Sequence, residues 1–515
     1  MKRLPQTRTS APAPCLDQAQ RTRVLFVLSL CLLLVVMDAT ILHTAMPSII
    51  DDLQPTSIAQ LWIVNAYALV LAGLLITTGA VGDRTGRKRL LLLGLAVFTG
   101  ASLLAVAVPT PGVLVLSRAL LGVGGAMIMP STLSILRNVF TGPAERARAI
   151  AVWGMMAALG GALGPVLGGA LVQWADWRSA FLVNVPIALA CLALSWRVLP
   201  ESSAPGTARL DLPSVALSFI GMVAVIQGIK ATTKDGPLTY ASGGALVLGV
   251  VLLASFVRRQ RTLDDPLVDT SLFRLRSVTL ALLAYLLVTA VLNAILCLSS
   301  QWFQTVRGMP PLTAGLRLLP AMVTMIAAGA VMPYLLRNLT TRVLLGAGVA
   351  LVGLSLLAPA VPGDEMTTVA VSLAVLGLGV TVAMSTCVAV IMSAVPPERA
   401  GRAAAVQESF LELGNVLGIS VLGSITALLY RHRLVPPPGT PDQALDAARD
   451  SVGEAAGIAE RLPEDAGRPL AQAANQAFDS AFVTTMTVTG VLVLLAACAV
   501  WMLLPPGKAA ATPMH

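Results

Sequence analysis

Long apolar runs alternate with short polar segments along nearly the whole chain of 515 residues. The runs lie at 24–48, 60–82, 90–108, 112–136, 148–172, 179–198, 212–229, 241–257, 277–303, 312–336, 342–361, 367–395, 403–430 and 480–504. Most approach or exceed the roughly 20 apolar residues with which an α-helix crosses a bilayer. Because lipid satisfies no backbone hydrogen bonds, such segments span as helices. The pattern predicts an all-α membrane protein with fourteen transmembrane helices.

The overall charge agrees with a membrane protein and indicates its orientation. Only 12% of the residues are charged, about half the share in a soluble domain. The net charge of +9 is explained by basic cytoplasmic loops, so we expect no nucleic-acid partner. The tails and loops on one side carry 24 of the 35 Lys and Arg residues, and the short loops on the other side carry five. We therefore expect a multi-pass protein of the inner, cytoplasmic membrane with both termini in the cytoplasm.

Several classes of protein are excluded by what the sequence lacks. The six cysteines are scattered singly, and there are only three histidines, so no metal site is expected. No lysine stands in a Walker-type phosphate-binding loop, which argues against ATP as the energy source. No cluster of catalytic groups indicates an enzyme, no cofactor is expected, and the longest loop is too short for a sensor's signalling domain.

An internal repeat indicates how the helices are grouped. The run that begins at Arg89 resembles the run that begins at Arg342, 253 residues later, and Pro143-Ala-Glu-Arg-Ala recurs as Pro396-Pro-Glu-Arg-Ala at the same offset. Two six-helix bundles flanking two inserted helices explain this offset, and parallel repeats are common in secondary transporters. The expected divisions are a cytoplasmic tail at 1–23, bundles at 24–198 and 277–504, inserted helices with cytoplasmic linkers at 199–276, an outer loop at 431–478 within the second bundle, and a cytoplasmic tail at 505–515.

The predicted loop between the second and third helices carries a glycine-rich, charged motif, Gly79-Ala-Val-Gly82-Asp83-Arg84-Thr-Gly86-Arg87-Lys88. Glycines permit a tight turn and close helix packing, and an acid beside bases can pair differently in different conformers. A basic loop that merely fixes the topology is the simpler alternative. The motif resembles the signature loop of the major facilitator superfamily. This resemblance implies a conformational gate made of Gly79, Asp83, Arg84, Gly86, Arg87 and Lys88.

The fifth predicted helix carries small residues and a proline at close spacing: Gly160, Gly164, Pro165, Gly168 and Gly169. Small residues let helices pack closely in membranes, and the proline removes a backbone hydrogen bond and bends the helix. Generic tight packing is one interpretation. The string also resembles the motif associated with the antiporters of the same superfamily, which favours export over uptake.

Two charged residues lie within predicted spans, where an unpaired charge is costly. Asp38 occurs in Met37-Asp-Ala-Thr-Ile-Leu-His43, and Arg118 lies inside the fourth span, in the same bundle. Asp38 can exchange a proton for a cation, or it forms a static bond between helices. Arg118 pairs with a carboxylate such as Asp38, or it extends to the bilayer surface. Both strings resemble motifs of the fourteen-span drug:proton antiporters, which implies proton coupling. The first departs at His43, where the family usually has Asn, and a proton path or plain packing both remain open for this histidine.

Two acids lie four residues apart in the thirteenth predicted span, Glu408 and Glu412. This spacing places them on one helical face, and two nearby acids in an apolar site disfavour ionisation of both. The region resembles the quaternary-ammonium efflux subgroup, which implies binding of a cation or proton. Gln407 and Met325 stand where some relatives carry acids, which argues against dication transport. Glu408 near the membrane surface is the alternative.

Aromatic and amide side chains supply candidate contacts for a cationic substrate. The candidates are Trp62, Asn65, Tyr67, Trp302 and Gln304; aromatic residues at the membrane interface are the alternative interpretation. The outer loop after Pro436 is either a short amphipathic helix or irregular.

The resemblance to the major facilitator superfamily extends from the first predicted span to the last. It implies a monomeric proton-coupled antiporter that exports small hydrophobic, often cationic, drugs or antibiotics across the cytoplasmic membrane. A dedicated exporter of one endogenous metabolite or antibiotic is the main alternative, and an uptake symporter is a further one. A panel of substrates separates the first two.

Overall fold

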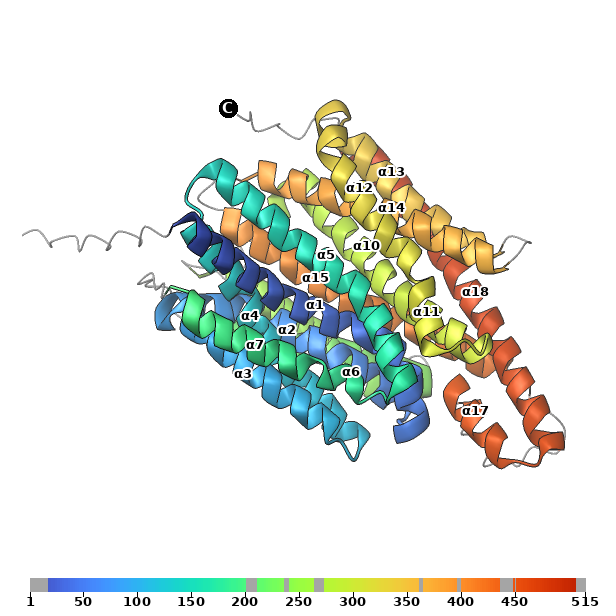
Figure 1. Cartoon of the computed structure of the whole chain (residues 1–515). Coiled ribbons are helices and arrows are strands. Elements are labelled where there is room, and N and C mark those ends of the chain that lie inside the picture. Colours follow the sequence, from blue (N-terminus) through green and yellow to red (C-terminus); the bar gives the residue numbers. More distant parts are fainter. Residues whose placement is uncertain are drawn as a thin grey trace, which may run out of the picture.

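The computed structural model describes residues 17–200, 211–235, 240–263, 273–360, 365–395, 400–435, 448–449 and 451–505. These residues form helices joined by short connections, with no β-strand among them. The long helices run in one general direction (Figure 1). We call the end where α1 begins and α18 ends the tail face, and the opposite end, beside α17, the α17 face.

In the described residues of the first half of the chain, the helices are α1 (Gln18–Leu53), α2 (Ser57–Thr85), α3 (Arg87–Val106), α4 (Pro111–Val139), α5 (Pro143–Trp174), α6 (Ser179–Leu182), α7 (Asn184–Val198), α8 (Leu212–Asp235) and α9 (Tyr240–Gln260). The second half contains α10 (Arg276–Gln301), the π-helical turn η2 (Trp302–Val306), α11 (Pro311–Arg317), α12 (Leu319–Asn338), α13 (Thr341–Leu357), the 3₁₀ turn η3 (Ala358–Ala360), α14 (Glu365–Ser393), α15 (Ala400–Arg433), α17 (Val452–Arg461) and α18 (Glu464–Leu503). Each predicted apolar run overlaps one or two of these helices.

Several regions differ from the simple pattern of one run and one helix; for example, the run 312–336 is divided into α11 and α12. The run 179–198 is divided into α6 and α7 at Val183. The last helix begins at Glu464 instead of near residue 480, and α17 precedes it, so much of the predicted outer loop is helical. Hydrophobicity could not reveal this extension because residues 464–479 are rich in polar helix formers. Some predicted segments lie outside the described residues. They are residues 1–16 of the predicted N-terminal tail, residues 506–515 of the predicted C-terminal tail, parts of both linkers, parts of the outer loop and the repeated loop at 396–399.

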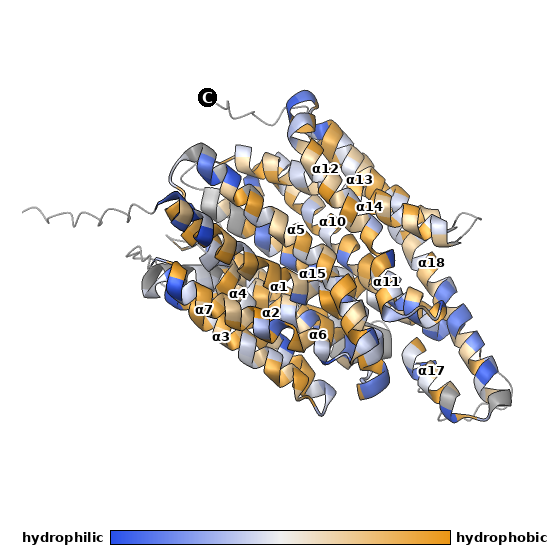
Figure 2. Ribbon diagram, in the orientation of Figure 1, coloured by the Kyte–Doolittle hydropathy of each residue, from blue (hydrophilic) through white to orange (hydrophobic). Residues whose placement is uncertain are grey.

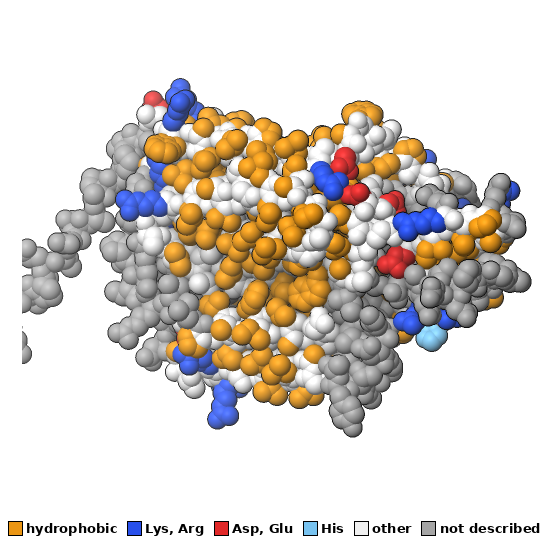
Figure 3. Space-filling model, turned by 90° about the horizontal axis from the view of Figure 1, so that it is seen from below, with side chains coloured by type: hydrophobic (Ala, Val, Ile, Leu, Met, Phe, Trp, Pro, Cys, Tyr) orange, Lys and Arg blue, Asp and Glu red, His pale blue; other side chains and the backbone are white. Residues whose placement is uncertain are grey.

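The composition of the helices fits a bilayer. Among the described residues, eleven helices are long and apolar enough to cross a membrane. Three shorter apolar stretches are Ala59–Leu75, Pro213–Ile229 and Thr341–Leu357. Figure 2 shows hydrophobic residues along the middle of the helices and hydrophilic residues towards their ends. On the face drawn in Figure 3, hydrophobic side chains cover the middle of the molecule, and most charged side chains lie towards its two ends. This distribution suits a body whose middle is surrounded by lipid.

Local signals fix where several helices begin and turn. Asp17 and Gln20 form a capping box at the start of α1, where the Gln20 N–H donates to the Asp17 carboxylate at 2.6 Å. Pro111 and Pro143 are the first residues of α4 and α5, a position where the missing N–H costs nothing. Gly86 has a φ of 102° and makes the turn from α2 into α3, a conformation that L side chains rarely adopt.

Two large hydrophobic cores organise the helices. The first core contains buried residues from Val24 to Leu199. The second contains buried residues from Val278 to Leu504. The helices α8 and α9, which lie between the two cores in the sequence, pack on each other. Through a small hydrophobic cluster, α8 also packs against α2 and α15. It therefore lies beside the seam between the two cores.

Equivalent close contacts recur in both cores. A Cβ atom on Gly124 of α4 would lie 3.0 Å from the carbonyl oxygen of Gly94 in α3. A Cβ atom on Gly379 of α14 would lie 2.9 Å from the carbonyl oxygen of Gly348 in α13. The glycines occur at nearly the same offset as the sequence repeat, and these contacts therefore support the repeat.

Candidate functional site

The first core contains a buried ion pair between α1 and α4. Nη1 of Arg118 lies 2.8 Å from Oδ2 of Asp38, and the two side chains are 1% and 0% exposed. Asn184 of α7 donates a hydrogen bond to Oδ1 of Asp38 at 2.7 Å. The Arg118 guanidinium also donates to the Ile63 carbonyl and lies 4.7 Å from the centre of the Tyr67 ring. The expected partnership of Asp38 and Arg118 is present, and Arg118 does not extend to the bilayer surface.

The burial of this pair makes each partner depend on the other. Removing one member of a buried ion pair leaves an uncompensated charge and costs about 3–5 kcal/mol. Asn184 adds a neutral donor that remains when the salt bridge is broken. We did not predict Asn184, although a lone amide in the apolar run 179–198 is the kind of signal that marks a functional polar group in a span.

A chain of polar side chains connects the first core to the second. His43 of α1 is 3% exposed, and its side chain lies beside Asn293 of α10. Asn293 donates to the side-chain oxygen of Asn415 in α15 at 2.5 Å, and Asn415 donates to Glu412 at 3.3 Å. Asn293 was not predicted; it too is a lone amide in an apolar run. The chain links a histidine in one core to a carboxyl group in the other.

The two acids of α15 differ in their surroundings. Glu412 is 6% exposed, and Glu408 is half-buried. They are close enough to interact electrostatically, as the single helical face predicts. Glu408 faces Tyr285 of α10, whose hydroxyl accepts a hydrogen bond from Gln407 at 3.3 Å. Both acids are therefore oriented towards α10 and the protein interior.

Of the predicted substrate contacts, Asn65 lies between the cores and Tyr67 lies within the first core. Asn65 of α2 donates to the Ser420 hydroxyl of α15 at 2.8 Å. The Tyr67 hydroxyl donates to the Val35 carbonyl at 3.0 Å, and its ring lies beside Arg118. These side chains support the ion pair and the contact between α2 and α15.

The two predicted tryptophans point elsewhere. Trp62 donates to the side chain of Gln227 in α8 at 3.2 Å, so it connects the inserted helices to the first core. Trp302 donates to Asp479 of α18 at 2.7 Å and stacks on Phe482, with ring centres 5.7 Å apart. Neither tryptophan lines the cavity described next. Helical spacing alone could not predict which neighbour each indole would face.

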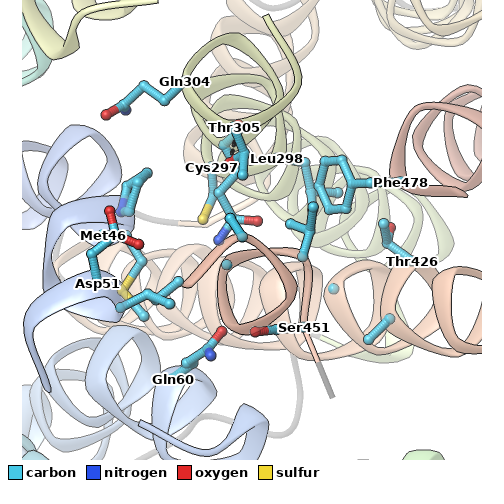
Figure 4. Close-up of a pocket in the computed structure, with 18 of the residues that line it drawn as sticks. Met46, Asp51, Gln60, Cys297, Leu298, Gln304, Thr305, Thr426, Ser451 and Phe478 are labelled. Carbon is cyan, nitrogen blue, oxygen red and sulfur yellow. Dashed lines mark hydrogen bonds between the residues drawn. The ribbon is translucent and has the colours of Figure 1, made fainter. Parts of the chain in front are cut away.

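A cavity of about 590 Å³ opens between the cores towards the α17 face. Figure 4 shows side chains converging on it from α1, α2, α10, η2, α15 and α18. The labelled lining residues are Met46, Asp51, Gln60, Cys297, Leu298, Gln304, Thr305, Thr426, Ser451 and Phe478. Its mixture of apolar, amide and hydroxyl groups suits a small amphiphilic ligand. Gln304, which donates to the Thr44 carbonyl at 3.1 Å, is the predicted contact residue that lines it.

Residues of α17 and its start also line this cavity, including Ser451, Gly453 and Gly457. A Cβ atom on Gly453 would lie 2.6 Å from the Ile50 side chain of α1. The short helix therefore packs against the first core although it belongs to the second half of the chain. The sequence left open whether this segment forms a helix, and it does.

The predicted gate lies at the tail face, around the turn at Gly86. The Arg87 guanidinium donates to the Ser134 carbonyl of α4 at 3.3 Å. The Lys88 amine donates to the carbonyl oxygens of Trp196 and Leu199, at 2.8 and 2.7 Å. These bonds satisfy carbonyls at the ends of α4 and α7, where cations are favoured.

The remaining residues of the predicted gate are Gly79, Asp83, Arg84 and Gly86 itself. Gly79 has room for a Cβ atom, the nearest neighbour being Pro130 at 3.9 Å. The side chains of Asp83 and Arg84 lie outside the described part of the structure.

The glycines of α5 bring two helices into close contact. Cβ atoms on Gly160, Gly164 and Gly168 would each lie 2.9 Å from a carbonyl oxygen of α1. The opposite side of α5 meets α11, where Gly169 packs on Pro311 and Gly315 packs on Pro165. The predicted motif thus packs α5 tightly against α1 in its own core and against α11 in the second half of the chain.

Comparisons with known proteins agree with this geometry. Residues 28–419 match the Major Facilitator Superfamily. The chain is 40% identical over 478 residues to the multidrug efflux pump LfrA of Mycolicibacterium smegmatis, covering 92% of this chain and 95% of that protein. It is 32% identical over 474 residues to the methyl viologen resistance protein SmvA of Salmonella typhimurium, covering 91% and 95%.

A solved structure shares the fold. It is a bacterial homologue of the human lysosomal transporter Spinster, in an inward-facing and occupied conformation, with a TM-score of 0.68, 17% identity, and coverage of 95% of this chain and 97% of that one. The sequence match, the apolar helices and the shared fold give one conclusion. The chain belongs to the Major Facilitator Superfamily and is a multi-pass membrane transporter, not an enzyme.

Proposed function

We propose that this protein is a proton-coupled antiporter that exports small hydrophobic, often cationic, compounds across the cytoplasmic membrane. The observation that carries the proposal is the buried ion pair of Asp38 and Arg118 with Asn184 at its side. A carboxylate in this position can accept a proton while the guanidinium keeps its bond to a carbonyl and its contact with an aromatic ring. The names of the relatives, a multidrug efflux pump and a methyl viologen resistance protein, support export of such compounds.

The proposed topology has fourteen spans, made of the eleven long helices and the three shorter apolar stretches. Residues 24–198 and 277–504 form two six-helix bundles, and 199–276 supplies the two inserted helices. Both termini are cytoplasmic, so that the α17 face is the outer one, and the protein acts as a monomer. The basic residues of the tail face support this orientation.

In the proposed cycle, proton binding and substrate binding alternate. A proton on Asp38 neutralises the carboxylate and weakens its attraction to Arg118, which allows α1 and α4 to shift. Glu408 and Glu412 attract a cationic substrate between the cores. The substrate leaves through the cavity at the α17 face. One charge that crosses 100 mV provides about 2.3 kcal/mol, enough for a useful gradient.

The direct test is ethidium efflux from energised cells that express the protein, with and without a protonophore. We expect efflux to collapse with the protonophore and in Asp38→Asn. Asp52→Asn is the matched control, because Asp52 lies on the same helix but at the α17 face, bound to Trp177 and Arg178. Efflux that persists in Asp38→Asn would remove that carboxylate from the proposal.

The same assay separates broad from narrow export. Transport of many unrelated cations supports a multidrug exporter. A correctly inserted protein that transports no ethidium, and only one compound from a panel, is the dedicated exporter instead.

A further inference from the structure

His43 is a buried histidine with an unusual hydrogen-bonding state. Its side chain lies beside Asn293, and its Nδ1 atom is buried and has no hydrogen-bond partner among the described residues. A neutral imidazole with its proton on Nε2 leaves Nδ1 free to accept one. A buried polar atom without a partner is uncommon and calls for a functional reason. Nδ1 carries a lone pair that can accept one proton.

The cavity at the α17 face comes close to this histidine. Met46, one helical turn beyond His43 on α1, lines the cavity, and so does Ala294, the neighbour of Asn293. Residues three apart on a helix lie on the same side. The cavity at the α17 face therefore ends about one helical turn of α1 from His43.

Charged and titratable groups of several helices lie in this region. Arg118 of α4 acts electrostatically on His43, and Tyr67 of α2 interacts in the same way with Arg118, with Asp38 of α1 and with Glu412 of α15. Asn184 of α7 and Asn293 of α10 are polar but do not titrate. The contact of α5 with this part of α1 is made by Gly164 and Gly168.

We propose that His43 binds the transported proton at Nδ1, one helical turn from the residues of α1 that line the cavity, and that its charge state acts through Asn293 and Asn415 on Glu412. This inference rests on the proposed proton-coupled function. It assigns a role at a position where the family usually has an asparagine, which cannot carry a proton.

The balance of the step is simple. A proton from water at the α17 face adds to the Nδ1 lone pair and forms an imidazolium; on release the N–H bond breaks and the electron pair stays on Nδ1. The positive charge of Arg118 opposes this uptake unless Asp38 is ionised and compensates it. His43 and Asp38 therefore hold a proton in alternation, and ionised Glu412 favours the proton on His43.

The test uses the full-length protein in proteoliposomes, with ethidium transport driven by a pH gradient. His43→Gln keeps a donor near the Nε2 position but cannot titrate, and His43→Asn restores the usual residue of the family. We expect both variants to lose the part of the rate's pH dependence that comes from titration of an imidazole. Their gradient-driven rate should fall about a hundredfold, the lower end of what one proton-transfer group contributes, while gradient-free ethidium exchange persists.

A wild-type pH profile in His43→Gln would overturn the inference, because glutamine can replace a histidine that only forms hydrogen bonds but cannot replace one that binds a proton. If the pH gradient does not change the rate of ethidium transport by the wild type, the proposed function itself is wrong. This result is distinguishable from a failure of the inference about His43.

A second measurement needs no change at position 43. The chain has three histidines, His43, His432 and His515, so that His432→Asn with His515→Gln leaves a single one for isotope-labelled NMR. We expect its ring signals to titrate and to shift when ethidium is added. Signals that change neither with pH nor with ethidium would also overturn the inference. This measurement remains decisive if the His43 variants fail to fold, because it keeps His43 in place.

Discussion

Where α5 meets α1 in the first core, the helices approach at glycines, and where α15 meets α10 in the second core, they do the same. A Cβ atom on Gly160 would lie 2.9 Å from the Leu33 carbonyl oxygen, and one on Gly418 would collide with the carbonyl group of Ala290. The two cores thus share a packing scheme that depends only on the absence of a side chain.

The charged groups do not follow that symmetry. The offset of 253 residues relates Asp38 to Val291 and Arg118 to Val371, and it relates Glu412 to Leu159. The ion pair thus belongs to the first core alone, and the acids belong to the second. Because a polar group in a span is costly, its position reflects a task and not the repeat. We infer that the first core handles protons and the second handles the cation.

The largest expected effect comes from breaking the ion pair of the first core. Arg118→Gln leaves Asp38 buried with only Asn184 as its partner, which should lower the free energy of unfolding by about 3–5 kcal/mol. Gradient-driven ethidium transport should be lost. Thermal unfolding of the purified protein and transport in proteoliposomes measure the two effects.

The double variant Asp38→Asn with Arg118→Gln sharpens this result. It removes both charges, so we expect stability to recover towards that of the wild type while transport stays absent. A double variant that transports ethidium as well as the wild type would show that the charges serve packing only.

The next largest effect tests the shared packing. Gly160→Ala and Gly418→Ala place a methyl group against backbone atoms, and overpacking of this kind costs about 1–3 kcal/mol. Gly161→Ala is the matched control, because its Cβ atom would lie 4.0 Å from Val36. Thermal midpoints should fall for the first two variants and stay unchanged for the control. Equal midpoints for Gly160→Ala and Gly161→Ala would refute the close approach of α5 and α1.

A smaller and more selective effect is expected in the second core. Glu412→Gln removes a buried negative charge, so the apparent affinity for ethidium should fall by about tenfold, or 1.4 kcal/mol. Export of an uncharged substrate should change little. Equal losses for charged and uncharged substrates would remove Glu412 from substrate binding.

The smallest effect lies in the inserted helices, which carry neither set of charges. Arg259 donates two hydrogen bonds to Asp211, at 2.8 and 2.9 Å, and these bonds hold the pKa of that carboxyl below its ordinary value. Its stabilising contribution is therefore present above the unfolded pKa of about 4 and lost only as the pH falls through the lower folded value. Asp211→Asn should lower the thermal midpoint slightly at pH 7, with transport and its pH profile unchanged. A shifted pH profile would assign this acid to the transport cycle.

Features that depend on one helix at a time were predictable from the sequence. The apolar runs overlap the helices, and the cost of an isolated charge in lipid predicted that Asp38 and Arg118 would meet. The glycine spacing of α5 predicted a close helix contact.

Features that depend on the rotation of one helix against another were not predictable. Trp62 and Trp302 face α8 and α18 rather than the cavity. Asn184 and Asn293 gain significance only from their neighbours in space. The cavity itself is formed by segments more than two hundred residues apart, which no local pattern joins.

The most direct measurement is ethidium transport in proteoliposomes that contain either the wild type or Asp38→Asn, with and without a pH gradient. For the wild type we predict accumulation driven by the gradient. For Asp38→Asn we predict exchange of ethidium without a gradient but no accumulation with one, because the carboxylate that binds the proton is missing. Accumulation in Asp38→Asn at the rate of the wild type would contradict the assignment of proton coupling to the first core.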